Sequence, residues 1–370
     1  MSKAADLART ASASETALSN RNIIINGAMQ ISQRSVSETG ITDTGYYTLD
    51  RWKSRIITMG TWTQTQSTDV PTGAGFATSL KMDCTTADGS PAATDVVQFF
   101  YGIEGQDVQQ LKYGTPDAEQ LTLSFWVKAT KTGLNVVTLF QDDAVKSVSG
   151  TYTISTSNTW EYKTLTFVGN TADVIANDNT RGLLVIWELG AGSNRTSGTL
   201  KTTWTDFIEA NESVGQVNNA DSTSNDWLIT GVQLEVGPVA TPFEHRSFGQ
   251  ELALCERYCT VYKTNGEGQI PHSSATVDVA NRPELLLLYP KKRANPSIAV
   301  VNPTNFKLLT AANTAVVATG YGGTYLGTGP DSAIMFWNVS SGVATNALSG
   351  VIQQLLIFQN TGSITIDAEL

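Results

Sequence analysis

Histidine and cysteine are scarce in this sequence, which limits the chemistry that it can support. The 370 residues include two histidines, His245 and His272, and three cysteines. The histidines form no His-x-x-His or HExxH pattern and the cysteines show no CxxC spacing, so no zinc site is predicted. An odd, sparse set of cysteines also argues against a disulfide framework. No P-loop, GxSxG or GxGxxG motif stands in a suitable context. We therefore expect no catalytic residues, no metal ligands and no bound cofactor.

Charged residues are also few, at 16% of the chain, and the formal net charge is −10. This balance argues against nucleic-acid binding, because phosphate contacts need lysine and arginine. Between Leu308 and Ile366 the only charged side chain is Asp331. Such a stretch is typical of a subunit interface or of an adhesive face rich in Tyr, Asn and Thr. We take it to predict self-association, as a homotrimer.

Long apolar runs are missing as well. No run reaches the ~18–20 residues of a membrane span, so membrane insertion is not expected. Residues 1–20 lack the apolar core of a signal peptide, and we expect synthesis in a cytoplasm. These residues are rich in Ala and Ser, and they predict a short helix or a flexible arm that attaches to a partner. A disordered tail is the alternative.

Short strands separated by turns are the main signal from residue 21 to residue 246. A strand at the start of 22–33 turns at Asn26 and Gly27, and 49–65 predicts a strand pair broken at Gly60. Residues 121–129 alternate, with Phe125 on the apolar side, and 134–141 follow a turn to complete a hairpin. Further strands are predicted at 160–168, 183–189 and 227–236. Strands at this spacing predict a β-sandwich, with a jelly roll as the favoured type.

A helical segment interrupts the strands at residues 247–263. Its apolar residues recur at helical spacing, Ser247 is a suitable N-cap, and Glu251 is an acid in the first turn. Strands follow again at 275–279, 284–289, 297–301, 315–318, 334–339 and 355–367. The sequence thus predicts an all-β protein: a jelly-roll sandwich (21–246), a connecting helix (247–263) and a smaller C-terminal β-sandwich (264–370).

Acidic residues leave one catalytic alternative open. A glycosidase needs two carboxylates, and Asp50, Glu188 and Glu235 are candidates. We favour the structural alternative, in which they are buried acids that pair with neighbours, such as Arg51 for Asp50. A structural calcium ion on loop carboxylates is a further alternative to a protein without cofactors, although no EF-hand or DxDxD spacing supports it.

Aromatic residues are the candidates for a ligand-binding surface. Tryptophans inside predicted strands are expected to pack in the core. Those tryptophans are Trp52, Trp126, Trp160 and Trp187. Less regular, Gly-rich surroundings make four other residues the ligand-facing candidates. These candidates are Trp62, Trp204, Tyr321 and Tyr325.

Blocks of sequence resemble, in this order, segments of a large group of phage particle proteins. The first block is RNIIINGAMQISQR at residues 21–34, followed by YTLDRW at 47–52. A longer block at residues 230–259 reads TGVQLEVGPVATPFEHRSFGQELALCERYC, and SITIDAEL stands at 363–370. The chain is therefore similar to tail-fibre or minor virion proteins of tailed phages. In that family the first and the long block bracket a jelly roll like that of carbohydrate-binding modules, and LSFWVKATKTG (121–133) matches its middle strand.

The FEHR segment of the long block predicts a structural clasp between the sandwich and the helix. The clasp consists of Phe243, Glu244, His245 and Arg246. Phe243 would lie under the sandwich, and Glu244 would meet the positive end of the helix dipole. A catalytic role for His245 would need a nucleophile that the sequence does not present. One departure from the family pattern is Cys259, where a tyrosine is usual.

Three functions follow from these observations. The first is a non-catalytic tail fibre or receptor-binding subunit of a phage virion, which binds other virion proteins through its N-terminal arm and the host through a surface glycan. The second is a capsid decoration, cement or head-spike protein, in which the arm grips the lattice. The third is a glycan-degrading tail enzyme, which predicts paired acids in a cleft and is disfavoured by the absence of a β-helix repeat.

Overall fold

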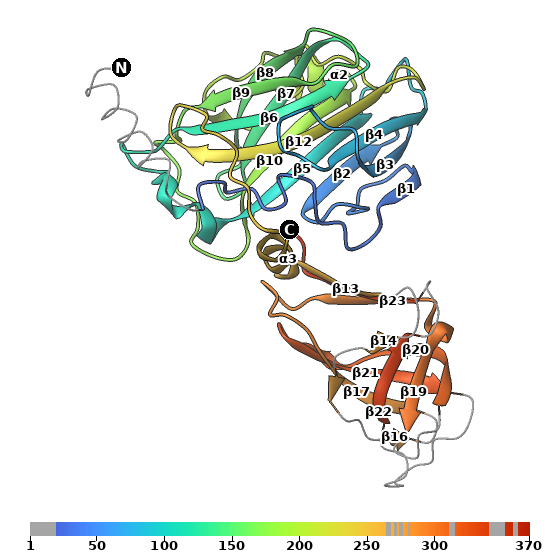
Figure 1. The fold of residues 1–370 in the computed structure, drawn as a ribbon. Helices are drawn as coiled ribbons and strands as arrows, with labels where there is room; N and C mark the ends of the chain where they lie inside the picture. The colour runs from blue at the N-terminus through green and yellow to red at the C-terminus, as the bar shows by residue number, and fades with distance from the viewer. Residues whose placement is uncertain are drawn as a thin grey trace. The chain divides into compact units, whose positions relative to one another are not determined.

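The computed structural model describes residues 20–263, 268–269, 272–273, 277–279, 282–310, 315–339, 352–357 and 362–370. The chain divides into two compact units, coloured blue to yellow and orange to red in Figure 1. The first unit extends to Glu251 and includes Leu370, and the second extends from Leu252 to Glu369. The boundary falls inside a helix, α3 (Phe248–Glu256). The predicted N-terminal arm lies outside the described residues, except for Asn20.

Two six-stranded antiparallel sheets form the first unit. Sheet A has the order β1 (Ser37–Ile41), β3 (Thr61–Ser67), β4 (Ser79–Thr86), β12 (Asp226–Val236), β6 (Leu121–Ala129) and β9 (Glu161–Phe167). Sheet B has the order β11 (Thr205–Asp206), β8 (Lys146–Ile154), β7 (Gly133–Gln141), β10 (Arg181–Ala191), β5 (Val96–Glu104) and β2 (Trp52–Ile57). Short helices lie in the connections: η1 (Gly105–Leu111), α2 (Ser193–Thr196) and η2 (Glu209–Asn211). The unit is a β-sandwich of the jelly-roll type, and the all-β prediction is confirmed.

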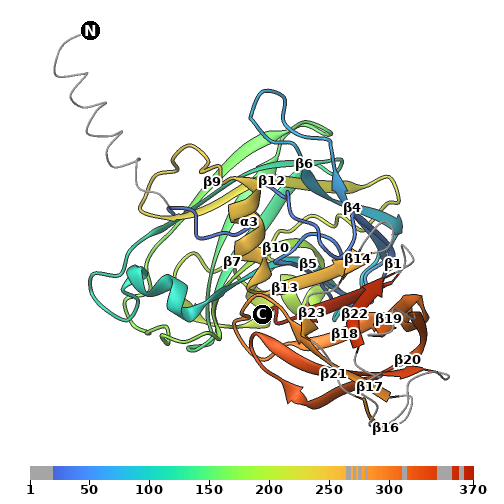
Figure 2. The same cartoon turned by 60° about the horizontal axis from the view of Figure 1, so that its bottom comes forward.

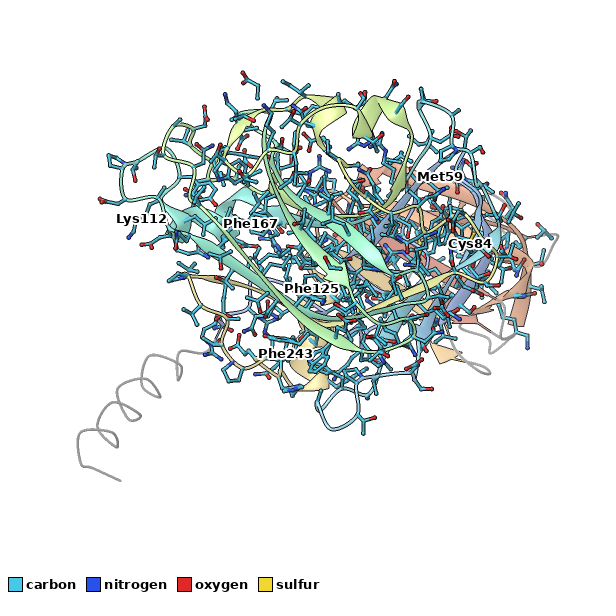
Figure 3. All side chains as sticks on the ribbon, turned by 90° about the horizontal axis from the view of Figure 1, so that it is seen from above. Met59, Cys84, Lys112, Phe125, Phe167 and Phe243 are labelled. Carbon is cyan, nitrogen blue, oxygen red and sulfur yellow. The ribbon has the colours of Figure 1, made fainter. Side chains whose placement is uncertain are left out.

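Large aromatic side chains fill the space between the two sheets. Phe125 of sheet A meets Trp187 of sheet B edge to face, with 5.9 Å between the ring centroids. Trp52 stacks on Phe99 within sheet B, and Phe99 meets Trp227 of sheet A. All five residues are fully buried. In Figure 3, Phe125 lies among densely packed side chains. Aromatic pairs in these geometries contribute about 0.5–1.5 kcal/mol each beyond the burial of their area.

Chain reversals in this sandwich mostly change sheet, and two of our pairings were therefore wrong. β2 and β3 flank Gly60 as predicted, but β2 belongs to sheet B and β3 to sheet A. The turn after β6 leads to β7 in the other sheet, so no hairpin forms. The strand predicted at 22–33 is also absent, and these residues form turns and irregular backbone. A turn signal marks a reversal, but the local sequence does not say which sheet receives the next strand.

The second unit is also built from antiparallel sheets. A three-stranded sheet has the order β13 (Cys259–Lys263), β23 (Ser363–Asp367) and β18 (Ser297–Val301). Among the described residues a larger sheet has the order β14 (Gly268–Gln269), β22 (Ile352–Ile357), β19 (Phe306–Thr310), β20 (Ala315–Thr328), β21 (Ser332–Val339), β17 (Arg282–Leu288) and β15 (His272–Ser273), with β16 (Val277–Val279) beside β17. A short helix, η3 (Pro303–Asn305), precedes β19. The core of the second unit includes the fully buried side chains of Trp337, Phe306 and Met335.

The connecting helix is shorter than predicted. It ends at Glu256, and Cys259–Lys263 form the strand β13 instead of a fourth helical turn. Cys259 pairs with Asp367 of β23, more than a hundred residues later. The single strand predicted at 355–367 is likewise two strands, β22 and β23. In both places a distant partner strand determines the structure, and a local periodicity cannot reveal it.

Candidate functional site

The outer face of sheet A presents two neighbouring aromatic rings. Along β6, Phe125 and Val127 point into the sandwich and are fully buried. Because side chains alternate along a strand, Ser124 and Trp126 lie on the opposite face. β9 pairs with β6 so that Tyr162 lies opposite Trp126, with ring centroids 5.4 Å apart. Tyr162 is 46% exposed, so this face offers an accessible aromatic platform. β6, β9 and β12 run side by side in Figures 1 and 2.

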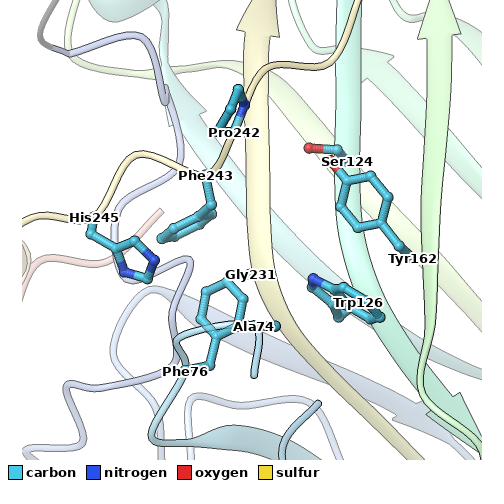
Figure 4. Close-up of a pocket in the computed structure, with 9 residues that line it drawn as sticks. All are labelled: Ala74, Phe76, Ser124, Trp126, Tyr162, Gly231, Pro242, Phe243 and His245. Carbon is cyan, nitrogen blue, oxygen red and sulfur yellow. The ribbon is translucent and has the colours of Figure 1, made fainter. Parts of the chain in front are cut away.

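A cavity of about 570 Å³ opens over this platform. Figure 4 shows the rings of Phe76, Phe243 and His245 on one side of β12, and those of Trp126 and Tyr162 on the other. The cavity is a cleft between two aromatic walls, with small side chains in between. Its lining consists of Ala74, Phe76, Ser124, Trp126, Tyr162, Gly231, Pro242, Phe243 and His245.

Gly231 makes the close packing of one wall possible. It lies at an irregularity of β12 with φ +61°, which disfavours a side chain. A Cβ atom at this position would lie only 2.5 Å from the Phe76 ring. Phe76 in turn meets Phe243 edge to face at 5.0 Å, and Phe243 meets His245 at 4.8 Å. Contacts among these three rings, above a glycine, thus hold the 69–78 loop against the segment after β12.

A second cavity of about 530 Å³ continues the first along β9. It is lined by Thr164 and by residues 238–242, and it shares Tyr162 and Pro242 with the first cavity. The two cavities therefore adjoin at these residues, and we call the two together the aromatic groove. Both volumes fall in the ~300–1,000 Å³ range of small-molecule sites.

A paired set of charges lies beside the groove. Trp160, two residues before Tyr162, donates its indole N–H to Asp69 at 2.9 Å. Lys128, two residues after Trp126, forms an ion pair with Asp69 and places its ammonium group 5.9 Å from the centre of the Trp160 ring. These contacts lower the pKa of Asp69 although its partial burial opposes them. The neighbouring charges are therefore satisfied among themselves.

The ligand-facing candidates from the sequence lie elsewhere. Trp62 is fully buried in the sandwich core, so this prediction was wrong. Trp204 packs edge to face on Tyr113 at 5.6 Å and donates to the carbonyl of Val168, and it does not line the groove. In the second unit, Tyr321 is half-buried against Trp337. The backbone of Tyr325 belongs to β20, and its side chain lies outside the described residues.

Two of the tryptophans that we expected in the core lie at the surface instead. Trp52 and Trp187 are fully buried. Trp126 forms a wall of the groove and Trp160 is only partly buried beside it. The signal that locates Trp126 was in the sequence, because it is out of phase with Phe125 and the other core residues of β6. Sequence reasoning missed Phe76 and Tyr162, which belong to no motif.

The three acids singled out from the sequence are all buried and hydrogen-bonded. Asp50 accepts from the backbone N–H of Gln33, and Glu235 accepts from the backbone N–H of Thr241. Glu188 lies on the outer face of sheet B, whereas Glu235 lies on that of sheet A. Since packed sheets are about 10 Å apart, these two acids are too distant to flank one glycosidic bond.

A buried carboxylate cluster lies on the outer face of sheet B, where residues 192–216 cover the strands. Glu188 accepts from the side chain of Gln98 at 2.7 Å and lies 3.6 Å from the guanidinium of Arg195. Glu212 accepts from Ser147 at 2.9 Å. Burial raises the pKa of Glu212 to about 7, and it also raises the pKa of Glu188, against the opposing effect of Arg195. One oxygen of each carboxylate has no hydrogen-bond partner among the residues that the structure describes.

The clasp residues divide between two tasks. Phe243 and His245 line the aromatic groove. Glu244 accepts hydrogen bonds from the backbone N–H groups of Asn20 and Asn22, at 2.5 and 2.8 Å. Arg246 donates to the carbonyl of Ile24 and forms ion pairs with Glu251 and Glu244, at 3.4 and 3.8 Å. The clasp thus holds the segment before β1, a partner that the sequence did not indicate.

Three of the sequence blocks that resemble phage proteins, at 21–34, 47–52 and 230–259, meet in one hydrogen-bonded network. From the first block, Asn26 donates its side-chain amide to the carbonyl of Asp50 in the YTLDRW block. Its backbone N–H donates to Glu251 of the long block. Trp52 donates its indole N–H to the carbonyl of Asn26 at 3.1 Å. Segments more than two hundred residues apart are therefore joined in the first unit.

Metal and membrane features are limited in the part of the chain that the structure describes. There, no three His, Cys, Asp or Glu side chains cluster closely enough to hold a metal ion. None of the described helices is both long and apolar enough to cross a membrane.

Comparisons with known proteins give similarity in structure only. No protein-family model and no curated protein matches the chain. A similar solved structure is the enzymatically active domain of tailspike protein 4 of bacteriophage CBA120, with a TM-score of 0.29 and 14% identity; the match covers 58% of this chain and 21% of that one. Another is a family 11 carbohydrate-binding module from Clostridium thermocellum, solved with a mixed-linked tetrasaccharide, with a TM-score of 0.26 and 12% identity over 56% of this chain and 99% of the module. None of these similarities is close enough to assign a function.

Proposed function

We propose that this chain is a non-catalytic structural protein of a bacteriophage virion, which attaches the particle to its host by binding a surface glycan. The observation that carries the proposal is the aromatic groove on sheet A. Its position would be a tail fibre or a receptor-binding subunit. The sequence blocks that resemble phage particle proteins support the virion context.

The chemistry of the groove suits a sugar. One face of a pyranose ring presents C–H groups, which are attracted to the negative face of an aromatic ring. Trp126 and Tyr162 offer such faces, and Tyr162 is accessible. The hydroxyl group of Thr164, which is exposed in the second cavity, can exchange hydrogen bonds with sugar hydroxyls. An apolar platform with a few polar groups is the usual composition of a small-molecule site.

Assembly is the second part of the proposal. The charge-poor stretch of the second unit supports a homotrimer, and residues 1–20 would bind neighbouring virion proteins. Light scattering of the full chain at micromolar concentration tests the trimer, and a monomeric mass would overturn it. Cryo-electron microscopy of the particle tests the position. Density at the tail supports a receptor-binding role, whereas density on the capsid shell would favour a decoration or cement protein.

The binding function is tested with a point variant of the groove. Purified full-length chain should bind host cells and compete with phage adsorption, and Trp126→Ala should remove both effects. Trp204→Ala is the matched control, since Trp204 is a partly exposed tryptophan of the same unit outside the groove. Equal competition by the wild type and Trp126→Ala would overturn the proposal.

A further inference from the structure

We infer that the aromatic groove selects uncharged glycans and binds several consecutive sugars of a chain rather than a single sugar. This inference rests on the proposed function. It follows from two further observations, the charge of the lining and the continuity of the two cavities.

The lining carries no fixed charge. Among the described residues that line the two cavities there is no Lys, Arg, Asp or Glu. His245 is the one lining side chain that can become a cation, and its ring is packed on Phe76 and Phe243. Transferring a sugar carboxylate or phosphate into such a site loses its hydration without a compensating partner. An uncharged sugar makes no such demand.

The nearest charged groups are already paired. Lys128 forms its ion pair with Asp69, which also accepts from Trp160. Glu235, on the same outer face, accepts hydrogen bonds from the backbone N–H and the hydroxyl group of Thr241, which lines the second cavity. To gain a cation, an acidic glycan would have to break the Lys128–Asp69 pair, and exchanging one ion pair for another gives little net free energy. The surroundings therefore reinforce the preference set by the lining.

The shape of the groove favours several sugars in a row. The two cavities, of about 570 and 530 Å³, share Tyr162 and Pro242, so a glycan that extends over both would contact these two residues between neighbouring sugars. A sugar in the first cavity lies between the walls of Trp126 and Phe243. The next lies against Tyr162 and Thr164. The contact between one sugar and the groove contributes little binding free energy, so measurable affinity requires several sugars to bind together.

The experiment uses the full chain on an array of bacterial surface polysaccharides that pairs uncharged O-polysaccharides with uronate- or sialate-bearing ones. Wild type, Trp126→Ala and Tyr162→Ala are compared, after circular dichroism has shown that each variant folds. Some glycans should bind Trp126→Ala with an affinity at least about tenfold lower than the wild type, and we expect all of these glycans to be uncharged. We also expect fragments of three or more sugars to inhibit binding at least tenfold better than the constituent monosaccharides.

A charge introduced into the groove gives an independent readout. Thr164→Lys places an ammonium group in the second cavity and should create binding to acidic glycans at low salt that 0.5 M NaCl removes. Thr153→Lys is the control, since Thr153 is an exposed strand residue on sheet B. Gain of acidic binding by both variants would show nonspecific attraction and overturn the charge argument.

The outcomes separate the inference from the proposed function. The inference is overturned if the wild type binds an acidic glycan and Trp126→Ala loses that binding. It is also overturned if a single sugar inhibits binding as strongly as a fragment does. Either result leaves glycan binding itself intact. No Trp126-dependent glycan at all overturns the proposed function and the inference with it.

Discussion

The side-chain amide of Asn22 donates a hydrogen bond to the carbonyl of Val232 at 3.0 Å, across 210 residues of sequence. The carbonyl oxygen of the same side chain accepts from the backbone N–H groups of Ile24 and Leu234, at 3.0 and 3.1 Å. One buried residue therefore satisfies three backbone groups of two distant segments. It holds the irregular segment before β1 against β12 where a regular strand pairing is lacking.

Replacing Asn22 by alanine is expected to destabilise the first unit by about 2–4 kcal/mol. The substitution leaves two buried N–H groups and one carbonyl without partners, and each unsatisfied group costs ~1–3 kcal/mol before relaxation. Urea denaturation followed by tryptophan fluorescence measures the change. Thr72→Ala, at an exposed loop position, should change the stability by less than about 0.5 kcal/mol. A loss below about 1 kcal/mol for Asn22→Ala would show that water replaces the side chain.

Gly231→Ala should disturb the groove more than its backbone conformation alone explains. Gly40 has a similar φ, +71° against +61°, but a Cβ atom there meets no other atom within 4 Å. Both substitutions incur the ~1–2 kcal/mol cost of a left-handed alanine, and only Gly231→Ala also displaces the Phe76 ring. We therefore expect Gly231→Ala to lose glycan binding at least tenfold and Gly40→Ala to retain it. Equal binding by both variants would show that the Phe76 wall is dispensable.

Adjacent residues on β6 should separate stability from binding. Phe125→Ala opens a cavity in the core and should cost about 3–5 kcal/mol. Trp126→Ala, on the outer face, should cost about 1 kcal/mol or less while binding is lost. Thermal melts and glycan binding measured on the same preparations check both. A loss of stability for Trp126→Ala as large as that of Phe125→Ala would contradict the assigned faces.

The buried carboxylate cluster predicts a pH dependence. The pKa of Glu212 is raised to about 7 in the folded state, against an ordinary value of 4.5. The folded state thus holds the proton more tightly, so stability from this group is present below pH 4.5 and is lost as the pH rises to 7. Relative to the wild type, Glu212→Gln should gain roughly 1–3 kcal/mol at pH 8 and nearly nothing at pH 4.

Urea denaturation of both proteins between pH 4 and pH 8 measures this difference. Glu209→Gln is the control, because Glu209 is an exposed carboxylate that approaches the same Arg195. It should show no gain at pH 8. A difference between Glu212→Gln and wild type that is independent of pH would refute the raised pKa.

The fold was largely predictable from the alternation of apolar residues, and the site was predictable only in part. Strand positions such as those of β6, β10 and β12 follow from composition and period, because one face of each must be buried. The same alternation also locates Trp126 on the outer face. We had placed it in the core because tryptophans inside strands are usually buried. Phe76 could not be found from sequence, since its place depends on the approach of a loop to Gly231.

Competition between local and distant interactions explains the other errors. The segment after Glu256 has helical periodicity, yet Cys259 and Tyr262 are paired with β23. Trp62 was assigned to an irregular region because of Gly60, but β3 aligns it with Cys84 of β4 and so directs it inward. In each case the deciding partner is remote in sequence, and its contribution is invisible to a local reading.

The walls of the aromatic groove have unequal freedom to evolve. Phe243 and His245 belong to the segment whose neighbours Glu244 and Arg246 fasten the start of the sandwich, so substitutions there put folding at risk. The 69–78 loop shares that task at its end, where the Thr78 hydroxyl donates to the carbonyl of Met29 at 2.7 Å. Tyr162 and Thr164, on the outer face of β9, take no part in it. Under the proposed function, exchanges at these two positions can alter glycan specificity while the start of the sandwich remains held. Variation between relatives should concentrate on that side of the groove.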